Sequence, residues 1–327
     1  MTGFLDRVDP ELLPGLEYSQ AHPPPTTVAE LSDFRARTSP AVSGLGDISF
    51  RDYPADGVLL RVFTPAETGP HPAIYWIHGG GMIAGSVDGD TSYCADLCAR
   101  TGAVVVAVDY RLAPEHPFPA PLDDVTAGLR WLFASAEALS VDPQRVAVAG
   151  SSAGGGLAAA LTLRNRDSGG PAVAFQYLMY PMLDSSHTSG SAVEFVGIPT
   201  WNAAHSRFAW ECYLGGFPAS AYAVPALADD LRGLPPTLIQ VGELDLFRDE
   251  DISFAARLLQ AGVPTELHVY PGAYHGFELN CPDSQVGAQS LRDRDRALVR
   301  ALHGSGTTAS HEYCSSPTNT PMEGSPL

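Results

Sequence analysis

Short runs of apolar residues, many of them β-branched, recur along the chain and alternate with longer segments whose apolar residues are spaced three or four apart. The short runs predict strands and the longer segments predict helices. Strands are expected at residues 48–53, 58–63, 73–77, 103–108, 145–149, 175–179, 237–241 and 266–270. Helices are expected at residues 121–139, 154–166, 201–214, 249–261 and 285–302.

The order of these elements predicts the fold class. The first two strands alternate apolar and polar residues around Pro54 and Gly57, which is typical of an edge hairpin. The runs at 73–77 and 103–108 are almost continuously apolar, as expected of strands buried on both faces. Strands that alternate with helices form crossover units, so we expect an α/β fold with a mainly parallel sheet flanked by helices.

Three regions fall outside this alternation. Residues 1–45 contain a proline-rich loop followed by a helix with Thr26 or Thr27 as its N-cap. Residues 184–232 form an insertion between two strands and carry an aromatic-rich helix. Residues 304–327 are rich in Gly, Ser, Thr and Pro, a composition that predicts disorder.

Composition narrows the classes of partner and environment. The 327 residues are 45% hydrophobic and carry a formal charge of −18, a field that repels nucleic acid and anionic lipid surfaces. No signal peptide or membrane-spanning run is apparent, so we expect a cytoplasmic protein without nucleic-acid or membrane partners. The five cysteines are too scattered for a disulfide framework. Cys94 and Cys98 fit one face of a helix. No cluster of further His or Cys residues accompanies them, so a zinc site is not expected.

A GxSxG motif, Gly150 to Gly154, lies between the strand at 145–149 and the helix that follows. A sharp strand–turn–helix elbow needs small residues on both sides of its serine and presents that serine at the carboxyl edge of the sheet. Ser152 has glycines at both required positions, whereas Ser151 is a competing hydroxyl without them. The motif predicts Ser152 as a nucleophile; taken alone, it also fits an ordinary turn.

Another glycine-rich segment, His78-Gly79-Gly80-Gly81, directly follows the buried strand at 73–77. Backbone amides free of neighbouring side chains are suited to binding an oxyanion. We expect the amides of Gly80 and Gly81 to serve as such donors, together with that of Ala153 from the elbow. Gly79 remains open as a further donor, and His78 is interpreted as a residue that orients the loop.

A serine nucleophile needs a base, and the base needs a carboxylate to orient it. Asp245 follows the strand at 237–241 and His275 follows the strand at 266–270. With Ser152 they occur in the order Ser, Asp, His, as this kind of elbow fold requires. Glu243 also lies at a strand end and competes with Asp245 for the role of orienting acid. Asp249 and Glu250 are interpreted as charges that favour the start of the next helix.

Four sequence blocks resemble the hormone-sensitive-lipase-like (bacterial type IV) esterases. They are HGGG at His78, YRLAPEHPFPAPLDD at Tyr110, GSSAGG at Gly150, and ELDLFRDE with YHGF around Asp245 and His275. The resemblance implies an α/β-hydrolase fold with an eight-stranded sheet in residues 46–303, and a cap made from residues 1–45 and the insertion at about 184–232. It also implies the catalytic roles given above. The usual Asp or Thr before the nucleophile is replaced by Ser151.

The predicted function is hydrolysis of small, short-chain carboxylic esters through an acyl-enzyme on Ser152, with no metal or cofactor. A lactone hydrolase or an acyltransferase on the same fold is the first alternative. A non-catalytic receptor for a hydrophobic small molecule is the second, and the presence of all three candidate residues argues against it. The resemblance further implies a possible homodimer formed through the last strand and helix.

Overall fold

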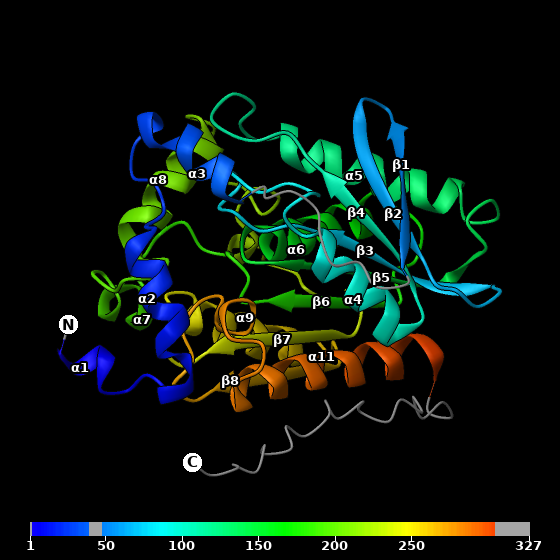
Figure 1. The fold of residues 1–327 in the computed structure, drawn as a ribbon. Helices are drawn as coiled ribbons and strands as arrows, with labels where there is room; N and C mark the ends of the chain where they lie inside the picture. Colours follow the sequence, from blue (N-terminus) through cyan, green and yellow to red (C-terminus); the bar gives the residue numbers. More distant parts are fainter. Residues whose placement is uncertain (1, 39–47, 305–327) are drawn as a thin grey trace, which may run out of the picture.

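The computed structural model describes residues 2–38 and 48–304. Within these residues, eight strands form one sheet in the order β1-β2-β4-β3-β5-β6-β7-β8, which confirms the expected fold (Figure 1). β2 pairs antiparallel with β1 and β4, and all other neighbouring strands are parallel. The strands are β1 (Ser49–Ala55), β2 (Val58–Thr64), β3 (His71–Ile77), β4 (Val104–Asp109), β5 (Val141–Ser151), β6 (Phe175–Met179), β7 (Thr237–Gly242) and β8 (Thr265–Tyr270).

Eleven α-helices accompany the sheet in the described part of the chain. They are α1 (Thr2–Leu5), α2 (Leu13–Ala21), α3 (Leu31–Thr38), α4 (Thr91–Thr101), α5 (Ala120–Ala134), α6 (Ala153–Asp167), α7 (Gly190–Glu194), α8 (Ala203–Leu214), α9 (Arg248–Gln260), α10 (Phe277–Asn280) and α11 (Gln285–His303). Three short 3-10 helices, η1 (Pro10–Leu12), η2 (Val28–Glu30) and η3 (Pro225–Leu227), lie between them. None of the helices within residues 2–38 and 48–304 is long and apolar enough to cross a membrane.

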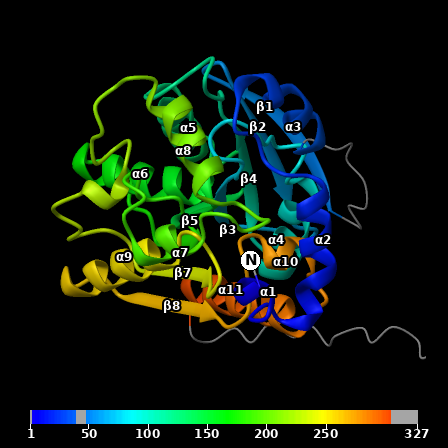
Figure 2. The same cartoon turned by 90° about the vertical axis from the view of Figure 1, so that its left-hand side faces the viewer.

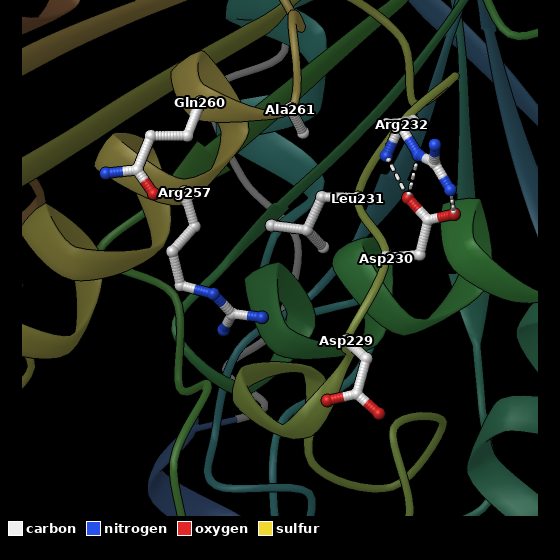
Figure 3. Close-up of a pocket in the computed structure, with 7 residues that line it drawn as sticks. All are labelled: Asp229, Asp230, Leu231, Arg232, Arg257, Gln260 and Ala261. Atoms are coloured by element: carbon white, nitrogen blue, oxygen red, sulfur yellow. Dashed lines mark hydrogen bonds and ion pairs between the residues drawn. The ribbon is translucent and has the colours of Figure 1, made fainter.

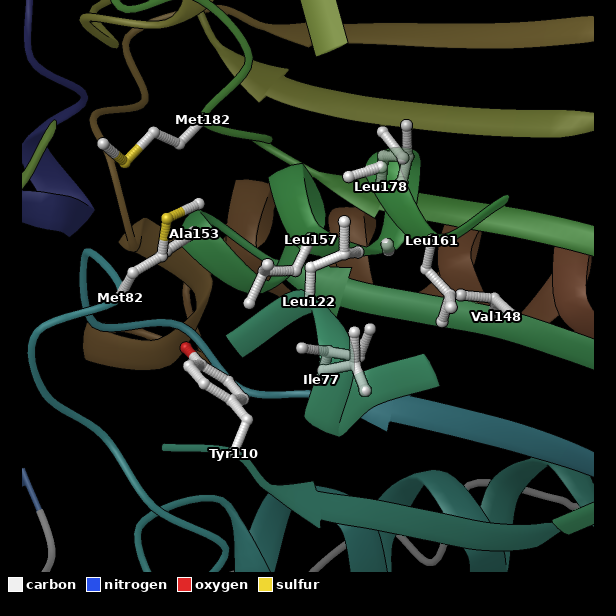
Figure 4. Close-up of a cluster of buried hydrophobic side chains, with 14 of the residues drawn as sticks. Ile77, Met82, Tyr110, Leu122, Val148, Ala153, Leu157, Leu161, Leu178 and Met182 are labelled. Carbon is white, nitrogen blue, oxygen red and sulfur yellow. The ribbon is translucent and has the colours of Figure 1, made fainter. Parts of the chain in front are cut away.

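Alternating side chains of the central strands fill two layers. Tyr75 and Ile77 of β3 belong to the cluster that also contains buried residues of α5, α6 and α9. Ile74 and Trp76, which point the other way, belong to the cluster with α4 and α11. Figure 2 shows these helix groups on opposite faces of the sheet, and Figure 4 shows side chains of the first layer. Burial on both faces explains why the strands have apolar sequences without alternation.

Some predicted boundaries need correction. The helix expected over 121–139 ends at Ala134, because the chain turns at Ser135 and re-enters the sheet at Val141. The helix expected from residue 201 begins at Ala203, since the side chain of Asn202 caps it. Thr27 is the N-cap residue at the start of η2, which leads into α3. The disorder predicted for 304–327 falls outside the described residues, apart from Gly304.

The N-terminal helices and the α7–α8 segment lie beyond the carboxyl ends of the parallel strands (Figures 1 and 2). A third apolar cluster joins these two segments to the loops after β7 and β8. Within it, the rings of Phe4 and Phe195 meet edge to face with centroids 6.1 Å apart. A Cβ on Gly81 would collide with the ring of Trp201, 2.5 Å away, and would press against Ala209 at 3.2 Å. Both segments therefore pack around the strand ends where the candidate residues lie.

Candidate active site

Ser152 occupies the turn between β5 and α6, with φ 54° and ψ −119°. A non-glycine residue at this φ is strained, and its N–H donates to the carbonyl of Met179 over 2.8 Å, which helps to hold the turn. A Cβ on Gly150 would collide with the backbone of Gly154, and one on Gly154 would collide with the carbonyl of Ile77. The two glycines of the motif are therefore required by close backbone approach.

Ser152, His275 and Asp245 form one chain of hydrogen bonds. His275 Nε2 lies 3.0 Å from Ser152 Oγ, and His275 Nδ1 lies 2.8 Å from Asp245 Oδ2. Because an ionised carboxylate only accepts, Nδ1 carries the proton and Nε2 accepts the serine hydroxyl. Asp245 is fully buried, and its second oxygen accepts the N–H of Phe247 over 2.9 Å. The structure thus brings together Ser152, Asp245 and His275, which were predicted from their positions after three different strands.

The two competing residues make other contacts. Ser151 ends β5, and its Oγ lies 3.0 Å from the position of a Cβ built on Gly79. Glu243 accepts hydrogen bonds from the backbone of Gly272 and from Arg7, each over 3.0 Å. The bond from Gly272 and the charge of Arg7 lower the pKa of Glu243. Glu243 therefore ties the N-terminal segment to the loop after β8, whereas Asp245 reaches His275.

The glycine loop lies against the serine turn. Gly80 and Gly81 have φ values of 109° and 65°, a region that disfavours other residues. The carbonyl of Gly80 accepts the N–H groups of Ile83 and Ala84, which fixes the loop. A Cβ on Gly79 would stand 3.5 Å from Ser152 Cβ, so the loop and the serine are neighbours.

The amides of Gly80 and Gly81 donate to no protein acceptor among residues 2–38 and 48–304. Ala153 begins α6, and the first-turn amides of a helix lack intrahelical partners. These N–H groups are therefore available to an oxyanion.

The side chain of His78 packs beneath the glycine loop, against Tyr110. Its ring stacks on that of Tyr110 with centroids 4.1 Å apart, and the Tyr110 hydroxyl donates to the His78 carbonyl over 3.0 Å. His78 Nδ1 lies 2.8 Å from the carbonyl oxygen of Gly79. His78 is 2% exposed, so its contacts are with the loop and the underlying layer. The orienting role of His78 stays a prediction.

Sequence reasoning missed the groups that surround His275. The ring of Tyr180 packs against the imidazole with centroids 4.4 Å apart, and Phe247 meets it edge to face at 5.3 Å. The Tyr180 hydroxyl donates to Glu278 over 2.5 Å. Tyr180 directly follows β6, so the strand-end rule that selected Asp245 and His275 was the signal that could have found it.

Two acids at the start of α9 are buried rather than solvated. Glu250 accepts the N–H groups of Leu183 and Asp184 over 2.8 and 3.0 Å. Asp251 is fully buried and its carboxylate has no partner in the described part of the chain. Burial raises the pKa of both carboxyls well above the ordinary range. Glu250 thus holds the beginning of the 184–232 segment against α9.

The structure also contains cavities away from Ser152. One of about 250 Å³ lies between residues 229–232 and the end of α9 and includes the ion pair of Arg232 with Asp230 (Figure 3). Another, of about 340 Å³, lies between the loop at 23–26, α3 and His205 of α8. Across residues 2–38 and 48–304, no three His, Cys, Asp or Glu side chains gather closely enough to hold a metal ion.

Comparisons with known proteins agree with this fold. The profile of the α/β hydrolase fold matches residues 74–279. Esterase LipI of Mycobacterium tuberculosis is 38% identical over 234 residues, which cover 69% of this chain and 72% of that protein. Ethyl acetate hydrolase of Pseudomonas putida is 32% identical over 242 residues, or 71% and 75% of the two chains. The solved structure of a bacterial heroin esterase superposes with a TM-score of 0.85 at 39% identity, covering 91% of this chain and 98% of that one.

Fold and site therefore define an enzyme of the α/β-hydrolase class. More narrowly, the chain belongs to the hormone-sensitive-lipase-like esterases of that fold and is a carboxylesterase-type hydrolase. The family that the sequence blocks resembled is confirmed.

Proposed function

We propose that this protein hydrolyses small, short-chain carboxylic esters, with Ser152 as the nucleophile. The observation that carries the proposal is the chain of hydrogen bonds from Ser152 Oγ through His275 to the buried Asp245. A hydroxyl becomes a competent nucleophile near neutral pH when an adjacent base removes its proton. The arrangement supplies that base and the carboxylate that fixes its tautomer.

The reaction proceeds in two steps. Ser152 Oγ attacks the ester carbonyl while His275 Nε2 takes its proton, and the tetrahedral intermediate then expels the alcohol, which receives the proton from His275. The product is an acyl-enzyme on Ser152. Water, deprotonated by the same imidazole, attacks this acyl group. The second tetrahedral intermediate then breaks its bond to Ser152 Oγ, which takes the proton back from the imidazolium, and the carboxylic acid is released. Asp245 stabilises the imidazolium in both steps without becoming protonated.

The developing oxyanion is assigned to the amides of Gly80, Gly81 and Ala153. Support comes from the free amides of the glycine loop, its proximity to Ser152 and the position of Ala153 at the N-terminus of α6. Such preorganised donors stabilise negative charge that develops in the transition state. Gly79 stays a candidate for a further donor.

The proposed cap consists of residues 1–45 and the 184–232 segment. Its support is the packing of Phe4 against Phe195 and of Trp201 against Gly81, which puts both segments around the site. A covered site suits a small ester that can enter it. A relative named for ethyl acetate hydrolysis is consistent with short acyl groups.

The homodimer and the cytoplasmic location stay predictions. β8 is an edge strand of the sheet, and an edge strand can pair with a strand of a second copy. Light scattering during size-exclusion chromatography measures whether the chain pairs in solution.

The deciding experiment compares Ser152→Ala with Ser151→Ala on p-nitrophenyl esters from acetate to decanoate. We expect Ser152→Ala to lose hydrolysis and labelling by a fluorophosphonate probe, and Ser151→Ala to keep both. We expect wild-type kcat/KM to be highest at acetate or butyrate. Hydrolysis retained by Ser152→Ala contradicts the nucleophile, and a decanoate optimum contradicts the short-chain preference.

A further inference from the structure

The imidazole of His275 is held by more than Asp245. Its ring lies against those of Tyr180 and Phe247, with centroid distances of 4.4 and 5.3 Å. The Tyr180 hydroxyl does not face solvent but donates to Glu278 over 2.5 Å. A carboxyl group is thus connected to the proposed general base through one aromatic ring.

Glu278 occupies an unusual position for an acid. It lies on α10, three residues after His275, and is 1% exposed. One of its carboxyl oxygens accepts the Tyr180 hydroxyl, and the other has no partner among the described residues. Tyr180 is itself fixed, because its N–H donates to the carbonyl of Gln240 over 2.6 Å. The contact therefore links the ends of β6 and β7 to the turn that carries His275.

The groups that act electrostatically on Glu278 come from several elements. They are Tyr93 of α4, Tyr177 of β6, Tyr180 after it, Tyr274 and His275 before α10, and Arg294 of α11. Of these, Arg294 carries a permanent positive charge and already pairs with Asp295 and Asp96, whereas His275 is positive only as the imidazolium.

Burial is the main cause that raises the pKa of Glu278, to about 6, while the hydrogen bond from Tyr180 and the charges of His275 and Arg294 lower it. Glu278 is consequently ionised above neutral pH and attracts a protonated His275.

We propose that Glu278, through Tyr180, is a positioning residue for His275 and favours the imidazolium that forms when Ser152 is deprotonated. The anchored hydroxyl fixes the plane of the Tyr180 ring, and that ring limits rotation of the imidazole. The carboxylate adds a second negative charge near the imidazole, beside that of Asp245. This inference rests on the proposed function, in which His275 is the general base.

Glu278→Gln tests the charge, because glutamine keeps the volume and an acceptor for the Tyr180 hydroxyl. We expect kcat for p-nitrophenyl acetate to fall about tenfold, as for the loss of one attractive charge at an effective dielectric constant near 20, with KM changed less than about twofold. The acid limb of kcat/KM should move to lower pH, since the imidazolium loses a stabilising charge.

Tyr180→Phe tests the link, because it keeps the ring and removes the hydroxyl. Without that hydrogen bond Glu278 holds its proton more tightly and is less often charged. We therefore expect kcat to fall and the acid limb of kcat/KM to move to lower pH, as in Glu278→Gln. In Tyr180→Phe/Glu278→Gln the two effects should combine to less than their product, because both act on one contact. Tyr180→Phe also provides the test if Glu278→Gln does not fold.

Glu137→Gln is the matched control, since it removes one negative charge from an exposed position and should leave the pH profile unchanged. A folded Glu278→Gln with wild-type kcat and an unmoved acid limb overturns the inference. His275→Ala, assayed in parallel, separates this failure from that of the proposed function: if it retains activity, the general base is wrong, and if it is inactive, only the positioning role is lost.

Discussion

The guanidinium of Arg35 binds the carboxylate of Glu115 through two parallel hydrogen bonds of 2.8 and 2.7 Å. The same guanidinium donates to the carbonyls of Ile83 and Ala113 over 2.8 and 2.9 Å. Arg35 belongs to α3, Ile83 follows the glycine loop, and Glu115 lies in the segment after β4. One side chain thus attaches the N-terminal part of the proposed cap to the loop that carries the proposed oxyanion donors.

Arg35→Ala should loosen this attachment. Because the bonds are charge-assisted but Arg35 is partly exposed, we expect the free energy of unfolding to fall by about 1–2 kcal/mol. KM for short esters should rise more than kcat falls, because the glycine loop remains in place while its cover moves. Urea denaturation and steady-state kinetics measure the two effects. Arg37→Ala is the control: Arg37 lies on the same helix and donates to one carbonyl, that of Pro23, over 3.3 Å. Equal effects of the two variants would contradict the attachment.

Asp245→Asn and Glu243→Gln together show which of the two carboxylates orients His275. An amide at this position no longer fixes the proton on His275 Nδ1, so we expect kcat to fall by roughly 10³- to 10⁴-fold with the fold retained. Glu243→Gln should leave kcat within about threefold of wild type, because Glu243 contacts Arg7 and Gly272 and not His275. Steady-state kinetics at pH 8 measure both variants. The reverse order of effects would assign the orienting role to Glu243.

Gly154→Ala should destabilise the whole protein. A Cβ there would collide with the carbonyls of Ile77 and His78, so α6 and β3 must separate. We expect a loss of about 3 kcal/mol or more in the free energy of unfolding, together with loss of activity. Gly197→Ala is the matched control, because a Cβ at Gly197 meets nothing within 4 Å. It should change stability by less than about 0.5 kcal/mol, as measured by urea denaturation.

The sheet and the three residues Ser152, Asp245 and His275 could be predicted because each has a signal in the local sequence. Continuous apolar runs mark strands buried on both faces, as in β3 and β4. In a parallel sheet the carboxyl ends of the strands meet at one edge, so Ser152, Asp245 and His275 were expected together although far apart in the chain. Glycines that flank the serine could be assigned to the turn because only a missing side chain allows the backbones to approach.

Burial of single acids could not be predicted in this way. Glu250 lies in the first turn of α9, where an acid is favourable whether solvated or buried, so its bonds to the backbone at 183–184 have no local signal. Glu278 meets Tyr180 only because the turn after β8 folds back over the end of β6. The end of α5 at Ala134 also depends on tertiary structure, since β5 starts earlier than its apolar run indicates.

Glu278 should make stability depend on pH in a predictable direction. Its pKa is raised from 4.5 to about 6 in the folded protein, so it favours folding below the unfolded pKa and this contribution is lost as pH rises through 6. A shift of that size corresponds to about 2 kcal/mol. Glutamine carries no charge at either pH. The free energy of unfolding of Glu278→Gln, measured relative to that of wild type, should therefore be about 2 kcal/mol higher at pH 7 than at pH 4. Urea denaturation at both pH values measures this difference, with Glu137→Gln as the exposed control. A stability difference between Glu278→Gln and wild type that is independent of pH would show that Glu278 is not a buried, titrating acid.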